Sequence, residues 1–226
     1  MMSEPWVQPH SIPLLLVLAL LALLPFAFMT LTSFVKFSIV FSILRNALGA
    51  GQVPSGMVIS ALSMVLSVLV MFPVGERVIQ AIDPIIQRID YRNPRSSTEG
   101  IFEAIQKGIE PLRTFWERNS STRERSICLS LAKKAQTSPD SSISEKDLSV
   151  IVPAFILTEL REAFEIGVLI YIPFLVIDLV ITNLLLALGI QTLSPTQISI
   201  PFKLLLFTMV DGWALLSSSL VLGYSH

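Results

Sequence analysis

Four long apolar runs, almost free of charge, constrain the fold of this chain more than any other feature of its sequence. The first, Ile12 to Val35, holds 24 residues without a charged side chain. A bilayer core of about 30 Å is spanned by about 20 residues of helix, so this run is long enough to cross a membrane. The other three runs are residues 55–75, 166–191 and 203–224. We therefore predict an all-α membrane protein with four apolar helices.

Composition divides the chain into three segments. Apolar residues make up 52% of the 226 residues and charged residues only 15%, and the charges are unevenly distributed. Residues 76–149 hold 12 of the 16 Lys and Arg and 11 of the 17 Asp and Glu. We predict an N-terminal hydrophobic hairpin in residues 1–75, a polar helical insert in residues 76–149 and a C-terminal hydrophobic hairpin in residues 150–226.

Charge, cysteine and histidine usage argue against several classes of function. The net charge of -1 offers no basic surface for nucleic acid. Cys128 is the single cysteine and forms no internal disulfide. His10 and His226 lie at opposite ends, and no Cys or His pair has the spacing of zinc ligands. We expect no metal and no other cofactor.

The polar insert is predicted to be helical. Apolar residues recur at helical spacing over residues 78–89 and again over residues 101–116. A Pro/Ser-rich break at residues 93–98 is expected to separate these two amphipathic helices. Ser144 and Asp147, three residues apart, resemble a capping box that begins the next helix.

Asp178 and Asp211 lie inside apolar runs, where a carboxylate costs roughly 2.5–3.5 kcal/mol on insertion scales. Such residues need a partner or a function, and three interpretations compete. The two carboxylates could activate water as an intramembrane aspartyl protease, or line a proton or ion pathway in a small transporter. In the third and commoner case, each pairs with Lys203, Lys36 or Arg45 on a neighbouring helix or subunit.

Further polar residues lie beside these runs. Glu159, with Glu162 and Glu165, precedes the third apolar run and would line the pathway in the transporter interpretation. The same residues also suit a solvated helix start, because acidic side chains favour the first turn of a helix. Trp213, two residues after Asp211, has the position of an interfacial aromatic anchor.

Four segments of the sequence carry a specific pattern: Lys36–Phe41 with Leu44–Gly49, Pro153–Gly167, Ile172–Val180, and Pro201–Phe207 with Asp211–Trp213. This pattern resembles the FliP/SctR family, inner-membrane export-apparatus proteins of bacterial flagella and injectisomes. The resemblance covers both hydrophobic hairpins. The first 11 residues contain no Lys or Arg, which favours the injectisome branch over the flagellar one.

The resemblance implies a multi-pass protein of the bacterial inner membrane that carries out no catalysis. Several copies, a pentamer by the pattern of the family, would assemble with two smaller hydrophobic export-apparatus subunits into a helical, conical oligomer. That oligomer would be the entrance portal of a type III secretion export gate, with unfolded secreted proteins as its cargo. The alternative from the residues alone is a small ion- or proton-coupled transporter that uses Asp178 and Asp211.

The segment after the third apolar run departs from the family. Members often carry a Met cluster there that acts as a flexible seal, whereas this chain has Ile190, Gln191, Thr192 and Leu193 after Gly189. These four residues are the candidate pore gate, because an apolar ring can close a pore by excluding water. The alternative is a plain turn before Pro195.

Positive charge predicts the orientation in the membrane. Lys36 and Arg45 flank the first connection with no acid between them, which favours that connection on the cytoplasmic side. The insert, residues 76–149, is then expected on the periplasmic side.

Overall fold

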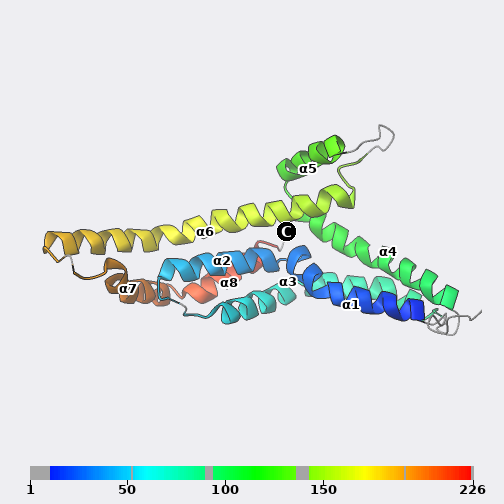
Figure 1. Ribbon diagram of the computed structural model, residues 1–226, viewed down its shortest axis with the longest axis horizontal. Coiled ribbons are helices and arrows are strands. Elements are labelled where there is room, and N and C mark those ends of the chain that lie inside the picture. Colours follow the sequence, from blue (N-terminus) through cyan, green and yellow to red (C-terminus); the bar gives the residue numbers. More distant parts are fainter. Residues whose placement is uncertain (1–10, 52, 90–93, 136–142, 191, 225–226) are drawn as a thin grey trace, which may run out of the picture. The chain divides into compact units, whose positions relative to one another are not determined.

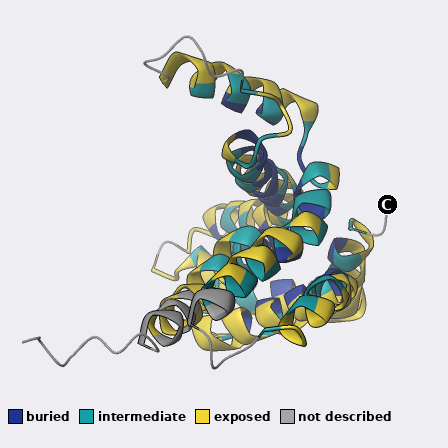
Figure 2. Cartoon of the chain, turned by 90° about the vertical axis from the view of Figure 1, so that its right-hand side faces the viewer, coloured by how far each residue is buried: buried dark blue, intermediate teal, exposed yellow. Residues whose placement is uncertain are grey.

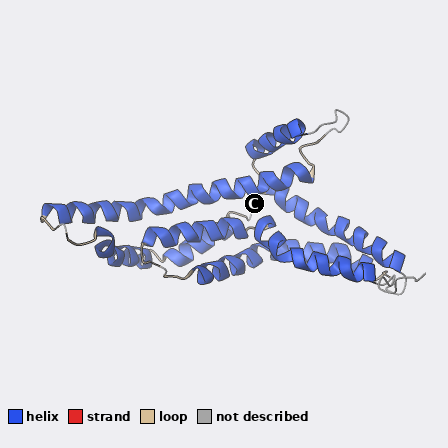
Figure 3. Cartoon of the chain, viewed as in Figure 1, coloured by secondary structure: helices blue, strands red, loops and turns tan. Residues whose placement is uncertain are grey.

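The computed structural model describes residues 11–51, 53–89, 94–135, 143–190 and 192–224. These residues form helices and no strand, so the all-α prediction is confirmed (Figures 1 and 3). The helices are α1 Ser11–Leu31, α2 Phe34–Leu48, α3 Gly56–Ile86, α4 Pro94–Arg118, α5 Thr122–Ala135, α6 Leu148–Ala187, α7 Pro195–Met209 and α8 Gly212–Leu222.

The chain divides into two compact units. Unit 1 comprises Met1–Thr32 and Met71–Phe155, and unit 2 comprises Ser33–Val70 and Ile156–His226. Unit 1 therefore holds α1, α4 and α5, whereas unit 2 holds α2, α7 and α8, and α3 and α6 contribute to both. The division into residues 1–75, 76–149 and 150–226 stays a prediction about composition.

Unit 1 is held by aromatic side chains from α4. Trp116 is buried and its indole N–H donates a hydrogen bond to the backbone oxygen of Leu31 at 2.8 Å. Phe115 meets Phe155 edge-on, with ring centroids 5.6 Å apart. The predicted break at residues 93–98 is too long, since α4 already begins at Pro94; proline suits the first turn of a helix. Residues 90–93 lie outside the described residues.

Unit 2 is built around α2. Phe37, Val40, Phe41 and Leu44 have no exposed surface, because apolar residues at this spacing share one helix face. Two small residues on α3, Ser63 and Ser67, are also fully buried. Small side chains let helices approach closely. Many helical residues are exposed, as the yellow parts of the ribbon in Figure 2 show.

Two predicted apolar helices extend further than expected. Residues 55–75 continue without a break into the first amphipathic segment, so that α3 runs to Ile86. The third run begins not at residue 166 but at Leu148. There the carboxylate of Asp147 accepts a hydrogen bond from the Ser144 N–H at 2.8 Å, one of the two bonds of the predicted capping box. With 40 residues, α6 is about 60 Å long, twice the thickness of a bilayer core.

The other two predicted helices are interrupted. The run from Ile12 to Val35 breaks after Leu31, and residues 203–224 break between Met209 and Gly212, where α7 and α8 bend by 58°. By length and composition, α3 and α6 can each cross a membrane, and the number of spans in the described part of the chain rises to four if each broken pair counts as one. The described part of the chain thus holds two to four apolar segments that are long enough to span a membrane.

Candidate functional site

The polar residues embedded in the apolar helices of unit 2 form two separate clusters. The first surrounds Lys36 on α2. Its ammonium lies 3.0 Å from a carboxylate oxygen of Glu159 and 2.8 Å from one of Glu162, which lie one turn apart on α6. The Glu159 side chain has no exposed surface and that of Lys36 only 8%. A buried charge is stable only when it is paired, so each of these two groups depends on the other.

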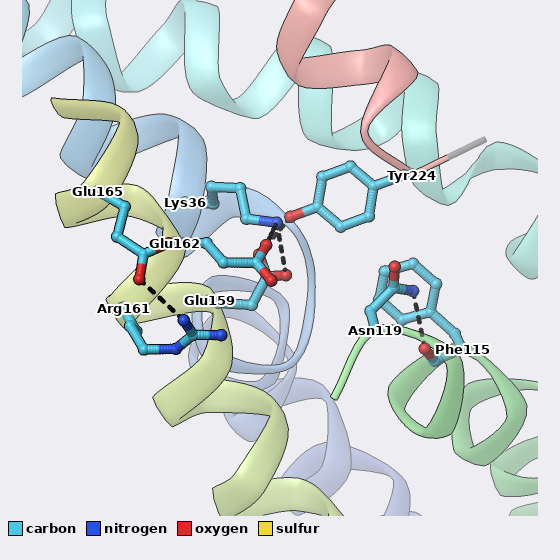
Figure 4. Close-up of polar contacts among 8 residues, drawn as sticks. All are labelled: Lys36, Phe115, Asn119, Glu159, Arg161, Glu162, Glu165 and Tyr224. Atoms are coloured by element: carbon cyan, nitrogen blue, oxygen red, sulfur yellow. Dashed lines mark hydrogen bonds and ion pairs between the residues drawn. The ribbon is translucent and has the colours of Figure 1, made fainter. Parts of the chain in front are cut away.

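Tyr224, two residues after α8, completes the Lys36 cluster. Its hydroxyl donates a hydrogen bond to Glu159, and the Lys36 ammonium lies 4.3 Å from the centre of its ring (Figure 4). Burial, together with the charge of Glu159, raises the pKa of Tyr224, so the phenol keeps the proton that it donates. The ring also meets Phe37 edge-on at 5.9 Å. The cluster therefore links α2, α6 and the segment after α8.

The second cluster surrounds Lys203 on α7. Its ammonium lies 2.7 Å from Asp178 of α6 and donates a hydrogen bond to the backbone oxygen of Ala47 at 2.9 Å. Ser199 donates a hydrogen bond of 2.5 Å to the other oxygen of Asp178. Ala47 lies in the last turn of α2, where backbone carbonyls lack helical partners and attract a cation. Lys203 thus joins the end of α2 to α6 and α7.

The end of α2 has the local structure that this contact requires. Gly49 follows the helix with φ of 70°, a left-handed conformation that glycine adopts without strain, and its N–H bonds to the carbonyl of Asn46. The chain turns away there and leaves the Ala47 carbonyl accessible to Lys203. Sequence analysis offered Lys203 as one of three partners for Asp178, and the structure brings these two together.

The bend between α7 and α8 depends on Asp211 and Gly212. Asp211 has φ of 51° and ψ of 48°, a left-handed conformation that Asp tolerates better than most residues. A Cβ atom on Gly212 would clash with the Phe207 ring, so only glycine fits at this close approach. Phe207 in turn meets Trp213 edge-on at 5.2 Å. The Asp-Gly pair thus allows the two helices to fold against each other.

Beside this bend lies an apolar cleft of about 340 Å³. Its lining comes from α6, α7 and α8 and is almost entirely apolar: Ile170, Pro173, Phe174, Leu206, Phe207, Val210, Gly212, Leu215, Leu216 and Ser219. Within the described residues, no group of three His, Cys, Asp or Glu side chains could hold a metal ion. The cleft can therefore bind apolar surface.

Two predicted site residues differ from expectation in their burial. Asp211 is exposed in the single chain and makes no ion pair in the described structure, and Trp213 is 38% exposed, with its ring 6.2 Å from that of Phe41. Arg45 is half-buried, and its Nε atom is buried without a hydrogen-bond partner.

The interpretation of Glu159 as part of a solvated helix start is wrong, because α6 begins eleven residues earlier, at Leu148. Lys36 likewise does not flank a connection between helices; it lies within α2 and is buried. Sequence analysis missed Tyr224 and Ser199. In the sequence, each is a single hydroxyl-bearing residue in or beside an apolar helix. Such residues are too common to be predicted as members of a polar cluster.

The candidate gate follows the C-terminal end of α6. The N–H of Gly189 bonds to the carbonyl of Leu186, and that of Ile190 to the carbonyl of Leu185, the pair of bonds typical of a helix that ends at a glycine. Ile190 is 36% exposed and Leu193 48%, and Thr192 is also exposed. Gln191 lies outside the described residues. The segment holds two apolar side chains at the surface, next to the start of α7.

Comparison with known proteins gives a consistent result. The sequence profile of the FliP family matches residues 17–220. The Yop proteins translocation protein R of Yersinia pestis is 44% identical over 220 residues, which cover 96% of this chain and 97% of that protein. The hypersensitivity response secretion protein HrcR of Ralstonia nicotianae is 40% identical over 90% of this chain and 93% of its own length. The flagellar biosynthetic protein FliP of Rhizobium meliloti is 39% identical over 90% of this chain and 80% of its own length.

Proposed function

Because this chain belongs to the FliP family of type III secretion export-apparatus components, we propose that several copies of it form the entrance portal for unfolded proteins. The portal lies in the bacterial inner membrane. The copies, five by the pattern of the family, assemble there with two smaller hydrophobic subunits. The names of the relatives from Yersinia and Ralstonia, which refer to translocation and secretion, support an injectisome.

The observation that carries this proposal is the uncovered apolar surface of α6. Of its most apolar 18-residue window, only 11% is buried in the chain. Its exposed side chains include Val168, Leu169, Leu175, Val176, Leu179, Leu184 and Leu186. A single soluble protein rarely leaves an apolar patch of this size uncovered. Neighbouring subunits and lipid together would cover a helix that is about 60 Å long.

The transporter alternative receives less support from the geometry. A relay needs carboxylates that gain and release protons in a water-accessible pathway. Asp178 is instead paired with Lys203 and hydrogen-bonded to Ser199, and Glu159 is paired with Lys36 and bonded to Tyr224. Both carboxylates therefore have structural partners within the chain.

The mass of the purified particle tests the proposal. We expect the protein, solubilised in detergent, to form a multi-copy particle that grows when the two small hydrophobic subunits are co-expressed. Light scattering combined with size-exclusion chromatography measures this mass independently of shape. A monomer in both preparations would refute the portal and favour the transporter.

We also propose that the segment from Ile190 to Leu193 closes the pore. Replacing Ile190 and Leu193 with Ser should wet the constriction and raise ion leakage, while the particle assembles normally. Conductance of the purified particle in a planar bilayer measures the leak. The matched control is Leu188→Ser, which removes a more exposed apolar side chain (71%) two residues before the gate. Equal conductance in the double variant and the unmodified particle would show that the segment only connects two helices and does not close the pore.

The periplasmic position of residues 76–149 is also a proposal. Ser130 on α5 is exposed, whereas Cys128 is buried, so Ser130→Cys in a Cys128→Ala background gives one accessible thiol in this segment. We expect a membrane-impermeant maleimide to label it in cells whose outer membrane alone is permeabilised. Labelling that requires lysis of the inner membrane would place the insert in the cytoplasm.

A further inference from the structure

The charged side chains of unit 2 form ion pairs within the chain, with two exceptions. Of the nine acidic and basic side chains in unit 2, seven take part in the ion pairs Lys36–Glu159, Lys36–Glu162, Arg161–Glu165 and Lys203–Asp178. The two that remain are Arg45 and Asp211, one of each sign. Neither makes an ion pair in the described structure, and the Nε atom of Arg45 is buried without a partner.

Both residues lie at the same level of unit 2. Arg45 lies on α2 between Phe41 and Ala47, and Asp211 lies between Lys203 and Trp213 along α7 and α8. The ring of Phe41 is 6.2 Å from that of Trp213, and the carbonyl of Ala47 is 2.9 Å from the Lys203 ammonium. The same stretch of α2 that carries Arg45 therefore runs alongside the stretch that carries Asp211.

The surroundings make an unpaired charge unfavourable at either place. Both residues belong to broken helix pairs that are apolar enough to count as candidate membrane spans. A charge in such a segment requires a partner, because neither lipid nor an apolar neighbour replaces the hydration that it loses. Asp211 is exposed on the surface of the chain, so a partner from outside can reach it.

We propose that Arg45 of one copy forms an ion pair with Asp211 of the adjacent copy. The inference rests on the proposed function, because it requires several copies side by side. A contact between two different surface patches is directional, and repeating it generates a ring or a helical array. In that array one repeated contact neutralises both remaining charges of every interior copy, and only the two ends of an open array keep one unpaired.

The geometry is tested by cross-linking copies that carry different tags. One copy carries Arg45→Cys and the other Asp211→Cys, both in a Cys128→Ala background, and the co-expressed particle is treated with a short bismaleimide. We expect a cross-linked product that contains both tags. Asn46→Cys is the matched control, because Asn46 is exposed next to Arg45 but points about a third of a turn around α2, and should cross-link to Asp211→Cys in much lower yield.

The energetic coupling is tested by neutralising each charge. Arg45→Gln and Asp211→Asn should each lower the fraction of chains in the full-size particle roughly five- to tenfold, and the double variant should lower it no further, because residues in contact are not additive. Asn tolerates the left-handed conformation at position 211. Arg45→Lys keeps the charge and should recover most of the assembly. Protease resistance of each variant verifies that the chain still folds.

Three outcomes would overturn the inference. Cross-links confined to chains with a double Arg45→Cys and Asp211→Cys substitution, and absent between tags, would make the pair internal to one copy. A full-size particle without cross-links, or with fully additive effects, would exclude this contact while the oligomer stands. A chain that stays monomeric in every preparation would exclude the contact together with the portal.

Discussion

Lys36 and Lys203 are both buried lysines that hold a carboxylate of α6, yet their surroundings differ. Lys36 faces Glu159, whose side chain has no exposed surface, and it has Glu162 and the ring of Tyr224 as further neighbours. Lys203 faces Asp178, whose side chain is 29% exposed, and it has a backbone carbonyl as its second partner. The Asp178 carboxylate is therefore partly open at the surface of the chain, whereas the Glu159 carboxylate is enclosed by its own chain.

The comparison indicates different roles for the two clusters. Within unit 2, the Lys36 cluster is a closed contact that depends only on groups of this chain and ties the segment after α8 to α2 and α6. The Lys203 cluster lies near the end of α2 and remains partly open on the side of Asp178. We expect the first to determine whether unit 2 folds, and the second to adjust how α7 packs.

Lys36→Met should have the largest effect. Methionine keeps the length of the side chain but leaves the Glu159 carboxylate buried without its cation, a loss of about 3–5 kcal/mol in the free energy of unfolding. Thermal unfolding of the detergent-solubilised protein measures the loss. The double variant Lys36→Met with Glu159→Gln removes both charges and should recover part of it. A double variant that is no more stable than Lys36→Met would show that packing, and not charge, dominates at this site.

Lys203→Met should destabilise the protein by about 2 kcal/mol, less than Lys36→Met, because Asp178 is only partly buried and keeps its hydrogen bond from Ser199. The Ala47 carbonyl also loses a donor. The measurement is the same thermal unfolding, followed by particle mass. Asp178→Asn in the Lys203→Met background should recover little, since the partly exposed carboxylate already has the Ser199 hydroxyl as a partner. A loss equal to that of Lys36→Met would mean that neighbouring copies cover Asp178 in the detergent particle.

The sequence predicted the class of structure well and the polar contacts only in part. Helical periodicity and charge-free length were sufficient for the all-α membrane fold, because both follow from local side-chain order. The sequence narrows the partner of Asp178 to three cations, one of which is Lys203, because a carboxylate in an apolar run requires a cation and the apolar segments hold few of them. Which cation it meets depends on how α6, α7 and α2 pack, and periodicity does not specify that.

Two errors have identifiable physical causes. A solvated helix start, one of two interpretations that the sequence allows for Glu159, is wrong, although the capping signal at Ser144 and Asp147 already marks the true start of α6. The bend at Asp211 was missed because the carboxylate was treated as a buried group, although an Asp-Gly pair commonly marks a turn. In both places the sequence pattern that marks a helix start or a turn is the better predictor of the local structure than the charge of the carboxylate.

Tyr224→Phe should have the smallest effect of the three substitutions, and it separates the two contributions of this side chain. Phenylalanine keeps a ring beneath the Lys36 ammonium and against Phe37, but it cannot donate a hydrogen bond to Glu159. Because Glu159 keeps its ion pair with Lys36, we expect a loss of about 1.5 kcal/mol, the value of one hydrogen bond to a charged group. Tyr224→Leu removes the ring as well and should lose about 1 kcal/mol more through the cation–π contact.

Equal stability of the Phe and Leu variants, measured by thermal unfolding in the same detergent, would mean that the ring adds nothing to the Lys36 cluster. If neither variant loses stability, the segment after α8 does not contribute to the Lys36 cluster. The closed contact would then consist of Lys36, Glu159 and Glu162 alone.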